Sequence, residues 1–244
     1  MSLNRGPKII TDGLILCYDA GDRKSYPESG TIWYDRTRSK ENGTLTNGPT
    51  YNSANGGSIV FDGTNDYVAV NANWELLNLQ VPMTITCWAR PTAFTTYNTL
   101  VAQYTNVTNS QLIKLLRIDN ISAGVNRLRY FTSTSSGGYQ YQEYTSQNVA
   151  TNAWQYFTAI VSGSISSATV TLGINNIFQS FSAFGTALSS TPDTTVPVRI
   201  GISSVAVPNE YFTGNIACVN IYNRALTTTE LTQNFTAQRG RFGI

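Results

Sequence analysis

The stretch at residues 58–70 constrains the fold of this chain more than any other. Two short runs rich in β-branched and aromatic residues, which favour strands, flank a cluster of Asp, Gly and Asn. Gly63 can adopt the positive φ of a tight turn, and the side chains of Asp62, Asn65 and Asp66 can bond nearby backbone amides. The pattern therefore predicts two antiparallel strands joined as a hairpin, with apolar side chains in a core.

Alternating apolar and polar residues predict strands along most of the chain. Residues 83–90, for example, place Met, Ile, Cys and Ala on one face and Thr, Thr, Trp and Arg on the other. Many short strands separated by turn residues are typical of a two-sheet jelly roll, so we predict an all-β antiparallel sandwich. The remaining predicted strands are 14–19, 99–104, 111–118, 127–133, 139–145, 154–161, 168–174, 177–181, 196–202 and 211–222.

Three segments receive more specific predictions. Residues 14–19 are apolar on both faces, which favours a central strand. Residues 20–57 are predicted as a long loop anchored by Trp33 and Tyr34, because Gly and Pro punctuate them throughout. A short helical turn is predicted within 71–81.

One helix is predicted, near the C-terminus. Thr227 followed three residues later by Glu230 is the pattern of a capping box, so the helix should span 228–238. A helix this short is not stable alone. Its apolar face, with Leu231 and Phe235, should therefore dock on the sandwich.

Length and composition favour a single domain. The chain has 244 residues and no linker, so we predict a polar arm at 1–13 and one domain at 14–244 that includes the helix. The basic tail at 239–242 is expected to be a solvated end, with contact to a neighbouring subunit as the alternative. A net charge of +2 provides little counterion release, and no run of about 18 apolar residues occurs, so we expect neither nucleic acid nor membrane as a partner.

The three cysteines lie in apolar, strand-like runs. Cys17, Cys87 and Cys218 are far apart in the sequence, and free Cys behaves as a small hydrophobic residue. We predict buried free thiols. One disulfide with a third, unpaired cysteine is the alternative.

Three motifs together resemble one family. They are Phe61-Asp62-Gly63 with Asp66-Tyr67-Val68, the segment 13–35, and the segment 214–226. This set resembles the laminin-G-like, concanavalin A-like jelly rolls, and it is similar to the versions found in structural proteins of tailed phages and other viruses. The resemblance implies that the last strand pairs with the first and that the protein is located on the virion surface. The apolar run at 14–18 is too short for a signal peptide and no membrane span is predicted, so we expect the chain to fold in the host cytoplasm.

The sequence gives little support to catalysis. Glycoside hydrolysis uses two carboxyl groups on either side of the scissile bond, and no predicted strand carries acidic residues at i and i+2. Histidine is absent, which excludes a Ser-His-Asp triad. We therefore predict a protein that is not an enzyme.

The sequence contains candidate residues for a calcium site and for a glycan site. Asp62, Asn65 and Asp66 concentrate oxygen atoms that calcium prefers, although the same atoms would serve as turn caps. The related domains often carry an acid where this chain has Ala217, which weakens the calcium interpretation. No other cofactor is predicted.

A glycan site is the second candidate. Tyr139 and Tyr141 share one face of a predicted strand, and together with Tyr104 they could stack on sugar rings. An aromatic ladder that only stabilises the sheet would explain the same pattern.

Two functions follow from different classes. The first is a virion structural or decoration protein of a phage head, neck or tail, in contact with itself and other virion proteins as a homo-oligomer, and with host glycans. The second is a carbohydrate-binding module or adhesin whose rim loops hold a glycan, with calcium as an aid. The fold alone does not choose between them, because one sandwich supports many functions.

Overall fold

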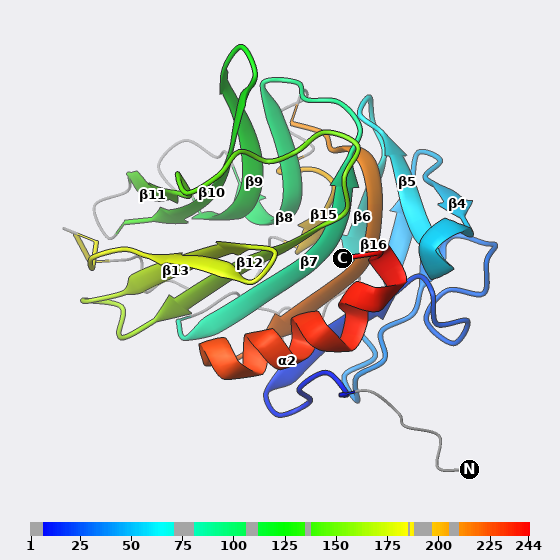
Figure 1. Cartoon of the computed structure of the whole chain (residues 1–244), viewed down its shortest axis with the longest axis horizontal. Coiled ribbons are helices and arrows are strands. Elements are labelled where there is room, and N and C mark those ends of the chain that lie inside the picture. Colours follow the sequence, from blue (N-terminus) through cyan, green and yellow to red (C-terminus); the bar gives the residue numbers. More distant parts are fainter. Residues whose placement is uncertain are drawn as a thin grey trace.

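Two antiparallel sheets of eight strands each pack face to face (Figure 1). This computed structural model describes residues 7–70, 81–105, 112–134, 138–184, 186–187, 197–204 and 210–244. The predicted all-β sandwich is confirmed.

The helix-side sheet carries the C-terminal helix on its outer face. Its strands are β1 (Leu14–Asp19), β4 (Thr50–Asn52), β5 (Ser58–Asp62), β7 (Met83–Pro91), β12 (Gln155–Ser162), β13 (Thr169–Ile174), β14 (Ile177–Ser180) and β16 (Thr213–Tyr222). They are ordered β14-β13-β12-β7-β16-β5-β4, and β1 pairs with β16. The last strand therefore pairs with the first, as the family resemblance implied.

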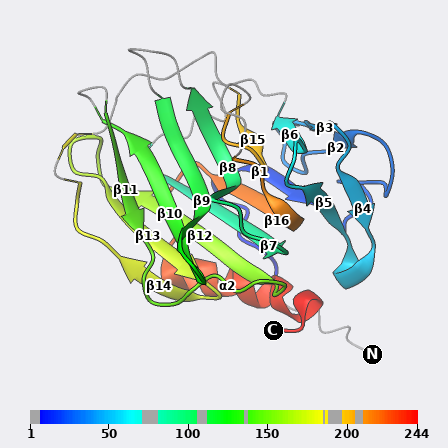
Figure 2. The ribbon, with the colours of Figure 1, turned by 90° about the horizontal axis from the view of Figure 1, so that it is seen from above.

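The opposite sheet faces away from the helix (Figure 2). Its strands are β2 (Ile32–Trp33), β3 (Gly43–Thr46), β6 (Tyr67–Val70), β8 (Tyr97–Thr105), β9 (Leu112–Ser122), β10 (Val125–Ser133), β11 (Tyr139–Glu143) and β15 (Arg199–Ile200). Their order is β11-β10-β9-β8-β15-β6-β3-β2. Strands β8 to β11 form a continuous antiparallel meander, because each pairs with the next.

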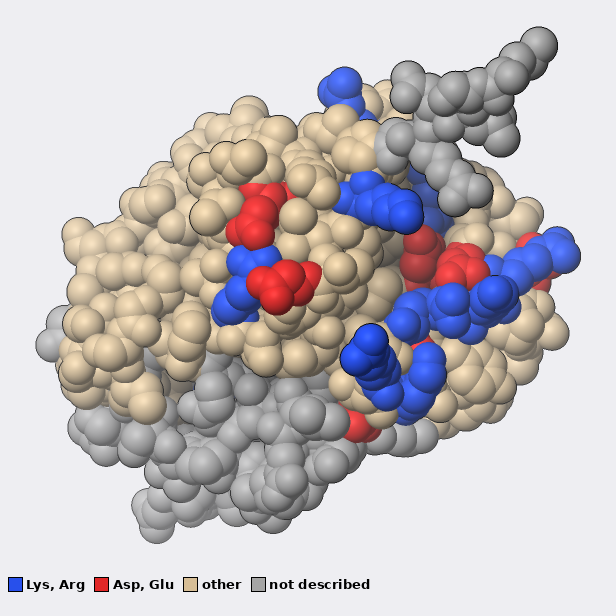
Figure 3. Space-filling view, turned by 90° about the horizontal axis from the view of Figure 1, so that it is seen from below, with Lys and Arg blue, Asp and Glu red and all other residues tan. Residues whose placement is uncertain are grey.

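The helix α2 (Thr228–Gln238) covers part of the helix-side sheet. Its capping box is present as predicted: the Thr227 side chain accepts from the backbone of Glu230, and the Glu230 side chain accepts from the backbone of Thr227. Leu231 and Phe235 are buried, which confirms the predicted docking face. Figure 3 looks onto this side and shows most of its Lys and Arg side chains gathered on one half of the face, with a few Asp and Glu side chains among them, while the described part of the other half carries one small charged group. Within the described residues, no helix is long and apolar enough to cross a membrane.

The C-terminal tail packs against the sandwich, so the predicted solvated end is wrong. Residues Arg239–Phe242 form a 3₁₀ helix, and the ring of Phe242 stacks on Trp88 at a centroid distance of 4.2 Å. Arg241 forms an ion pair with Asp19, with Nη1 2.5 Å from Oδ1. The aromatic side chain outweighs the polar neighbours that suggested exposure, because its burial removes a large apolar area from water.

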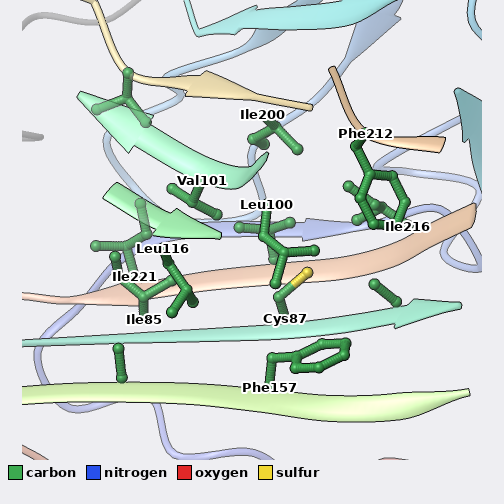
Figure 4. Packing of buried hydrophobic residues seen from close by; sticks show 14 of the residues in the cluster. Ile85, Cys87, Leu100, Val101, Leu116, Phe157, Ile200, Phe212, Ile216 and Ile221 are labelled. Carbon is green, nitrogen blue, oxygen red and sulfur yellow. The ribbon is translucent and has the colours of Figure 1, made fainter. Parts of the chain in front are cut away.

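The main core lies between the two sheets (Figure 4). Leu100 and Leu116 from the opposite sheet pack into the same cluster as Ile85, Cys87 and Phe157 from the helix-side sheet. Each of these side chains is at most 1% exposed. Full burial of such side chains stabilises the fold by about 1.5–3 kcal/mol each, which is the main reason the two layers hold together.

The predicted hairpin at 58–70 is wrong, although its turn is correct. Strands β5 and β6 form where expected, but β5 pairs with β4 and β16 while β6 pairs with β3 and β15. The turn between them therefore carries the chain from one sheet to the other. Gly63 has φ +77°, and a Cβ there would lie 1.9 Å from Thr213 Oγ1. Local turn chemistry predicts a reversal of the chain but not which strands pair on either side of it.

Other sequence predictions also need correction. Residues 20–57 contain β2, β3 and β4 as well as a short 3₁₀ helix at Ala54–Gly56. Trp33 is fully buried and stacks on Tyr18 as an anchor should, but Tyr34 is 43% exposed. Strand β1 pairs along one side only, with β16, so it is not a central strand. The predicted helical turn at 71–81 lies almost entirely outside the described residues.

The three cysteines are free thiols, as predicted. Cys87 and Cys218 are buried, and Cys17 is half-buried. Burial raises the pKa of the Cys17 thiol to about 12. A thiol with such a pKa carries almost no thiolate at neutral pH and is therefore a poor nucleophile.

The capping pair predicts a loss of stability in acid. The hydrogen bonds from Arg224 are the largest cause that lowers the pKa of Glu230 from 4.5 to about 2. A depressed pKa stabilises the fold above pH 4.5, and this contribution is lost as the pH falls toward 2. Glu230→Gln should cost about 1 kcal/mol of unfolding free energy at pH 7, because the pair is partly exposed.

Urea unfolding of the two proteins across this pH range measures the difference. It should shrink as the pH approaches 2, where the wild-type carboxylate also becomes protonated. A difference that stays constant with pH would contradict the role assigned to Glu230.

Candidate functional site

The face of strands β8 to β11 that turns away from the main core gathers aromatic and charged side chains. Side chains alternate along each strand, so residues two apart share a face. The register places Arg129 of β10 opposite Arg117 of β9 on one side and opposite Glu143 of β11 on the other. Three strands thus bring charged groups from distant parts of the sequence together.

A hollow of about 200 Å³ opens on this face. We call it the tyrosine pocket. It is lined by Tyr97, Tyr104, Leu115, Arg117, Phe131, Tyr139 and Glu210. It is smaller than the clefts of ~300–1,000 Å³ that hold drug-sized ligands, which suits a single sugar ring or a group of that size.

Arg117 forms the polar centre of the tyrosine pocket. Its guanidinium group donates to both oxygens of Asp119, at 2.6 and 3.2 Å, and to Oε1 of Glu210 at 3.1 Å. The rings of Tyr97 and Phe131 lie 4.0 and 4.4 Å from its central carbon. Carboxylates hold its edges and aromatic rings cover its faces, so the side chain is fixed in one position.

A second arginine extends this network toward β11. Arg129 donates to Asp119 Oδ2 at 2.9 Å and pairs closely with Glu143. Its guanidinium group lies 4.8 Å from the ring of Tyr141, and that ring stacks on Phe131 at 5.1 Å. The aromatic and charged residues therefore form one connected surface.

Glu210 and Tyr104 meet at the tyrosine pocket. Burial, with the negative charge of Glu210 as the second cause, raises the pKa of Tyr104. Its hydroxyl therefore keeps its proton at neutral pH and can donate a hydrogen bond. Glu210 itself is 8% exposed, and its Oε2 has no hydrogen-bond partner in the structure.

The structure brings the predicted glycan residues to one surface. Tyr104 and Tyr139 both line the tyrosine pocket, and Tyr141 lies beside it on Phe131. Tyr139 and Tyr141 are 56% and 47% exposed, which leaves their faces accessible. Tyr130, on the same strand as Phe131, points into the core and is 1% exposed. Whether these residues bind glycan stays a prediction.

The charged members of the site are not apparent in the sequence. Arg117 with Asp119, and Arg129 with Phe131, show the i, i+2 spacing that places each pair on one face. The pairing of the strands, which local pattern does not predict, brings these two pairs together. Glu210 arrives from a different part of the chain, just before β16.

The proposed calcium residues act mainly on the turn between β5 and β6. Asp62 Oδ1 accepts from the backbone of Thr64 at 2.8 Å, and Asp66 Oδ2 accepts from the backbone of Asp62 at 3.0 Å. These are the turn-capping bonds that the alternative interpretation predicted. Burial is the largest single influence on the pKa of Asp62 and raises it, but the hydrogen bonds from the amides of Thr64, Asn65 and Asp66 together outweigh burial and lower the pKa.

No cation cluster is recognisable in the described ranges. None of their Asp, Glu and Cys side chains form a group of three or more that could hold a metal ion. Calcium binding by Asp62, Asn65 and Asp66 stays a prediction.

Solved structures with a similar fold include a neurotoxin binding domain and a sialidase. The binding domain of botulinum neurotoxin DC, solved with SialylT, aligns with a TM-score of 0.65 and 13% identity over 93% of this chain and 52% of its own. A Trypanosoma rangeli sialidase, solved as a covalent intermediate with 2,3-difluorosialic acid, aligns with a TM-score of 0.66 and 13% identity over 97% of this chain and 35% of its own. This chain therefore spans about half of the first and a third of the second, and the likeness shows a shared fold.

Sequence comparison identifies the family. A search of curated proteins finds no match. The profile described as the concanavalin A-like lectin/glucanases superfamily matches residues 62–232, which is most of the chain and includes strands of both sheets. The chain belongs to the concanavalin A-like lectin/glucanase superfamily, in its laminin-G-like branch.

Proposed function

We propose that this protein is a non-enzymatic carbohydrate-binding domain that holds a sugar in the tyrosine pocket. The observation that carries the proposal is the hollow itself, where three tyrosines and a phenylalanine surround hydrogen-bonding groups. Sugars present apolar C–H faces and hydroxyl edges. Aromatic rings match the faces, and the Tyr104 hydroxyl and the Glu210 carboxylate match the edges.

The charged network favours binding over catalysis. A glycosidase needs two carboxyl groups directed at the scissile bond. Both oxygens of Asp119 accept from guanidinium groups, and Glu143 is paired with Arg129. These carboxylates serve to position the arginines, and this leaves Glu210 as the carboxylate that lines the tyrosine pocket.

The similar structures support a sugar as the class of ligand. They include a neurotoxin binding domain in complex with SialylT, a botulinum neurotoxin type C whose cell entry depends on interaction with two ganglioside molecules, and a sialidase in complex with sialic acid. Because identity is 13–14%, we take from them only the kind of ligand that this fold accommodates.

Binding in the tyrosine pocket should not require calcium, because the pocket provides aromatic and hydrogen-bonding groups of its own. A panel of soluble oligosaccharides, tested with calcium and then with chelator, examines this. We expect saturable binding that survives the chelator. Binding abolished by the chelator would assign recognition to Asp62, Asn65 and Asp66 instead, and no binding to any sugar would contradict the proposal.

A structural role on a virion surface is a second candidate. Its support is the low share of charged residues, 12% of the chain, and the exposed edge strand β14, where Ile177 is 53% exposed. Edge strands with apolar side chains pair readily with further copies, so we propose a closed homo-oligomer. Light scattering should give a mass above that of one chain. A monomer at every concentration would contradict self-assembly, and absence from purified particles would contradict the virion role.

A further inference from the structure

The tyrosine pocket contains a cation that two protein carboxylates already neutralise. Arg117 donates from Nε and Nη2 to Asp119 and from Nη1 to Glu210, which uses three of its five N–H donors. The rings of Tyr97 and Phe131 lie 4.0 and 4.4 Å from its central carbon. The positive charge of Arg117 is therefore balanced by protein groups before any ligand binds.

The neighbouring cations are occupied as well. Arg129 is shared between Asp119 and Glu143, and Arg127 donates to the carbonyl oxygen of Thr145. Lys114 is three residues from Arg117 on the same strand, so its side chain lies on the other face, where it is 6% exposed. Arg117, Arg127 and Arg129 thus each donate to a protein oxygen, although Nε of Arg127 has no acceptor. Arg199 of β15 lies one strand away, opposite Ala102 of β8, and does not line the tyrosine pocket.

Arg117 and Glu210 are the charged residues that line the tyrosine pocket, and of these two it is the negative one, Glu210, that has an unpartnered atom. Glu210 lines the tyrosine pocket, gives one oxygen to Arg117 and leaves Oε2 buried without a hydrogen bond. Buried carboxylate oxygens are normally paired, because an unpaired one loses its hydration without compensation. A ligand hydroxyl is a donor that would satisfy this oxygen, whereas a ligand carboxylate would be repelled by it.

From this arrangement we infer that the tyrosine pocket selects neutral, hydroxyl-rich sugars and discriminates against acidic sugars. The inference rests on the proposed carbohydrate-binding function and specifies its ligand class. The inferred preference for neutral sugars distinguishes this protein from the similar structures solved with sialic acid or 2,3-difluorosialic acid. The fold is shared with them, but the charged side chains of the site belong to this chain.

Matched pairs of sugars test the inference. We would measure, by calorimetry at physiological ionic strength, the methyl glycosides of glucose and galactose against those of glucuronic and galacturonic acid, together with lactose against 3′-sialyllactose. In the uronic acid pairs only the CH₂OH group is replaced by a carboxylate. For each pair that binds, the neutral member should bind at least about tenfold more tightly.

A variant identifies the residue responsible. Glu210→Gln keeps the shape of the side chain, removes its negative charge and frees Arg117, so the preference for the neutral sugar should fall by about tenfold. Glu28→Gln is the matched control, since Glu28 forms an exposed ion pair with Arg23 in another part of the molecule. Its preference should equal that of the wild type.

The possible failures are distinguishable. Equal or tighter binding of the acidic members by the wild type would overturn the inference and leave the carbohydrate-binding function intact. An unchanged preference in Glu210→Gln would overturn the role of Glu210. No binding of any member, neutral or acidic, would overturn the binding function itself.

Discussion

Replacing Trp88 with alanine should lower the free energy of unfolding by about 3–5 kcal/mol. Trp88 is fully buried between the helix-side sheet and the C-terminal segment. Its ring contacts Tyr156, Phe235 and Phe242 at centroid distances of 5.1, 5.6 and 4.2 Å. The substitution removes the surface on which α2 and the 3₁₀ tail dock, so both lose their largest apolar contact.

Chemical unfolding monitored by circular dichroism measures this loss. Trp88→Phe keeps an aromatic ring but removes the hydrogen bond from Nε1 to Gln238, which is 3.0 Å long, and should cost about 1–2 kcal/mol. Tyr34→Ala is the control, because Tyr34 is 43% exposed and should change stability by less than about 0.5 kcal/mol. A loss for Trp88→Ala no greater than that of the control would show that the helix docks without this cluster.

Replacing Tyr139 with alanine should weaken sugar binding by about tenfold while the protein stays folded. Tyr139 lines the tyrosine pocket and is 56% exposed, so its ring is available to a ligand and contributes little to the core. Loss of one aromatic stacking contact and its buried area corresponds to about 1.4 kcal/mol.

The experiment compares binding and stability in the same variants. Tyr34→Ala again provides the control, since it removes an exposed tyrosine that does not line the tyrosine pocket. Equal affinity in Tyr139→Ala and wild type would place the sugar elsewhere. A large loss of stability in Tyr139→Ala would mean that the ring serves the sheet, as the aromatic-ladder interpretation holds.

Most strands of this fold are predictable because their signal is local. Alternation marks β7 over its whole length, and the two positive-φ residues Asn175 and Asn176 form the predicted turn between β13 and β14. The capping box of α2 is likewise defined by a stretch of four residues, from Thr227 to Glu230. Such features depend on neighbours in the sequence, which is what pattern analysis measures.

The predictions that were wrong concern features that depend on residues far away in the sequence. Strands β5 and β6 have the composition of a hairpin, but each finds better partners in a different sheet. The tail at Arg239–Phe242 is basic and short, yet Phe242 finds an aromatic pocket made by Trp88 and Trp154. Tertiary packing overrides local preference in both cases.

The candidate site was predictable only in part for the same reason. The spacing of Tyr139 and Tyr141 indicates an aromatic face within one strand. The ion pairs of Arg117 with Asp119 and Glu210 form only in the folded protein, and Glu210 lies 93 residues from Arg117 in the sequence. The charge that we expect to set the selectivity of the tyrosine pocket is therefore visible only in the structure.

An NMR titration that follows the tyrosine rings tests most directly whether a sugar binds in the tyrosine pocket. The chain has 14 tyrosines, and selective labelling would report on each while the tightest neutral sugar of the panel is added. We expect saturable shifts of the ring signals of Tyr97, Tyr104 and Tyr139, and no shift of the ring signals of Tyr34. Saturation of binding without shifts at those three rings would contradict this expectation, because the sugar would then bind outside the tyrosine pocket.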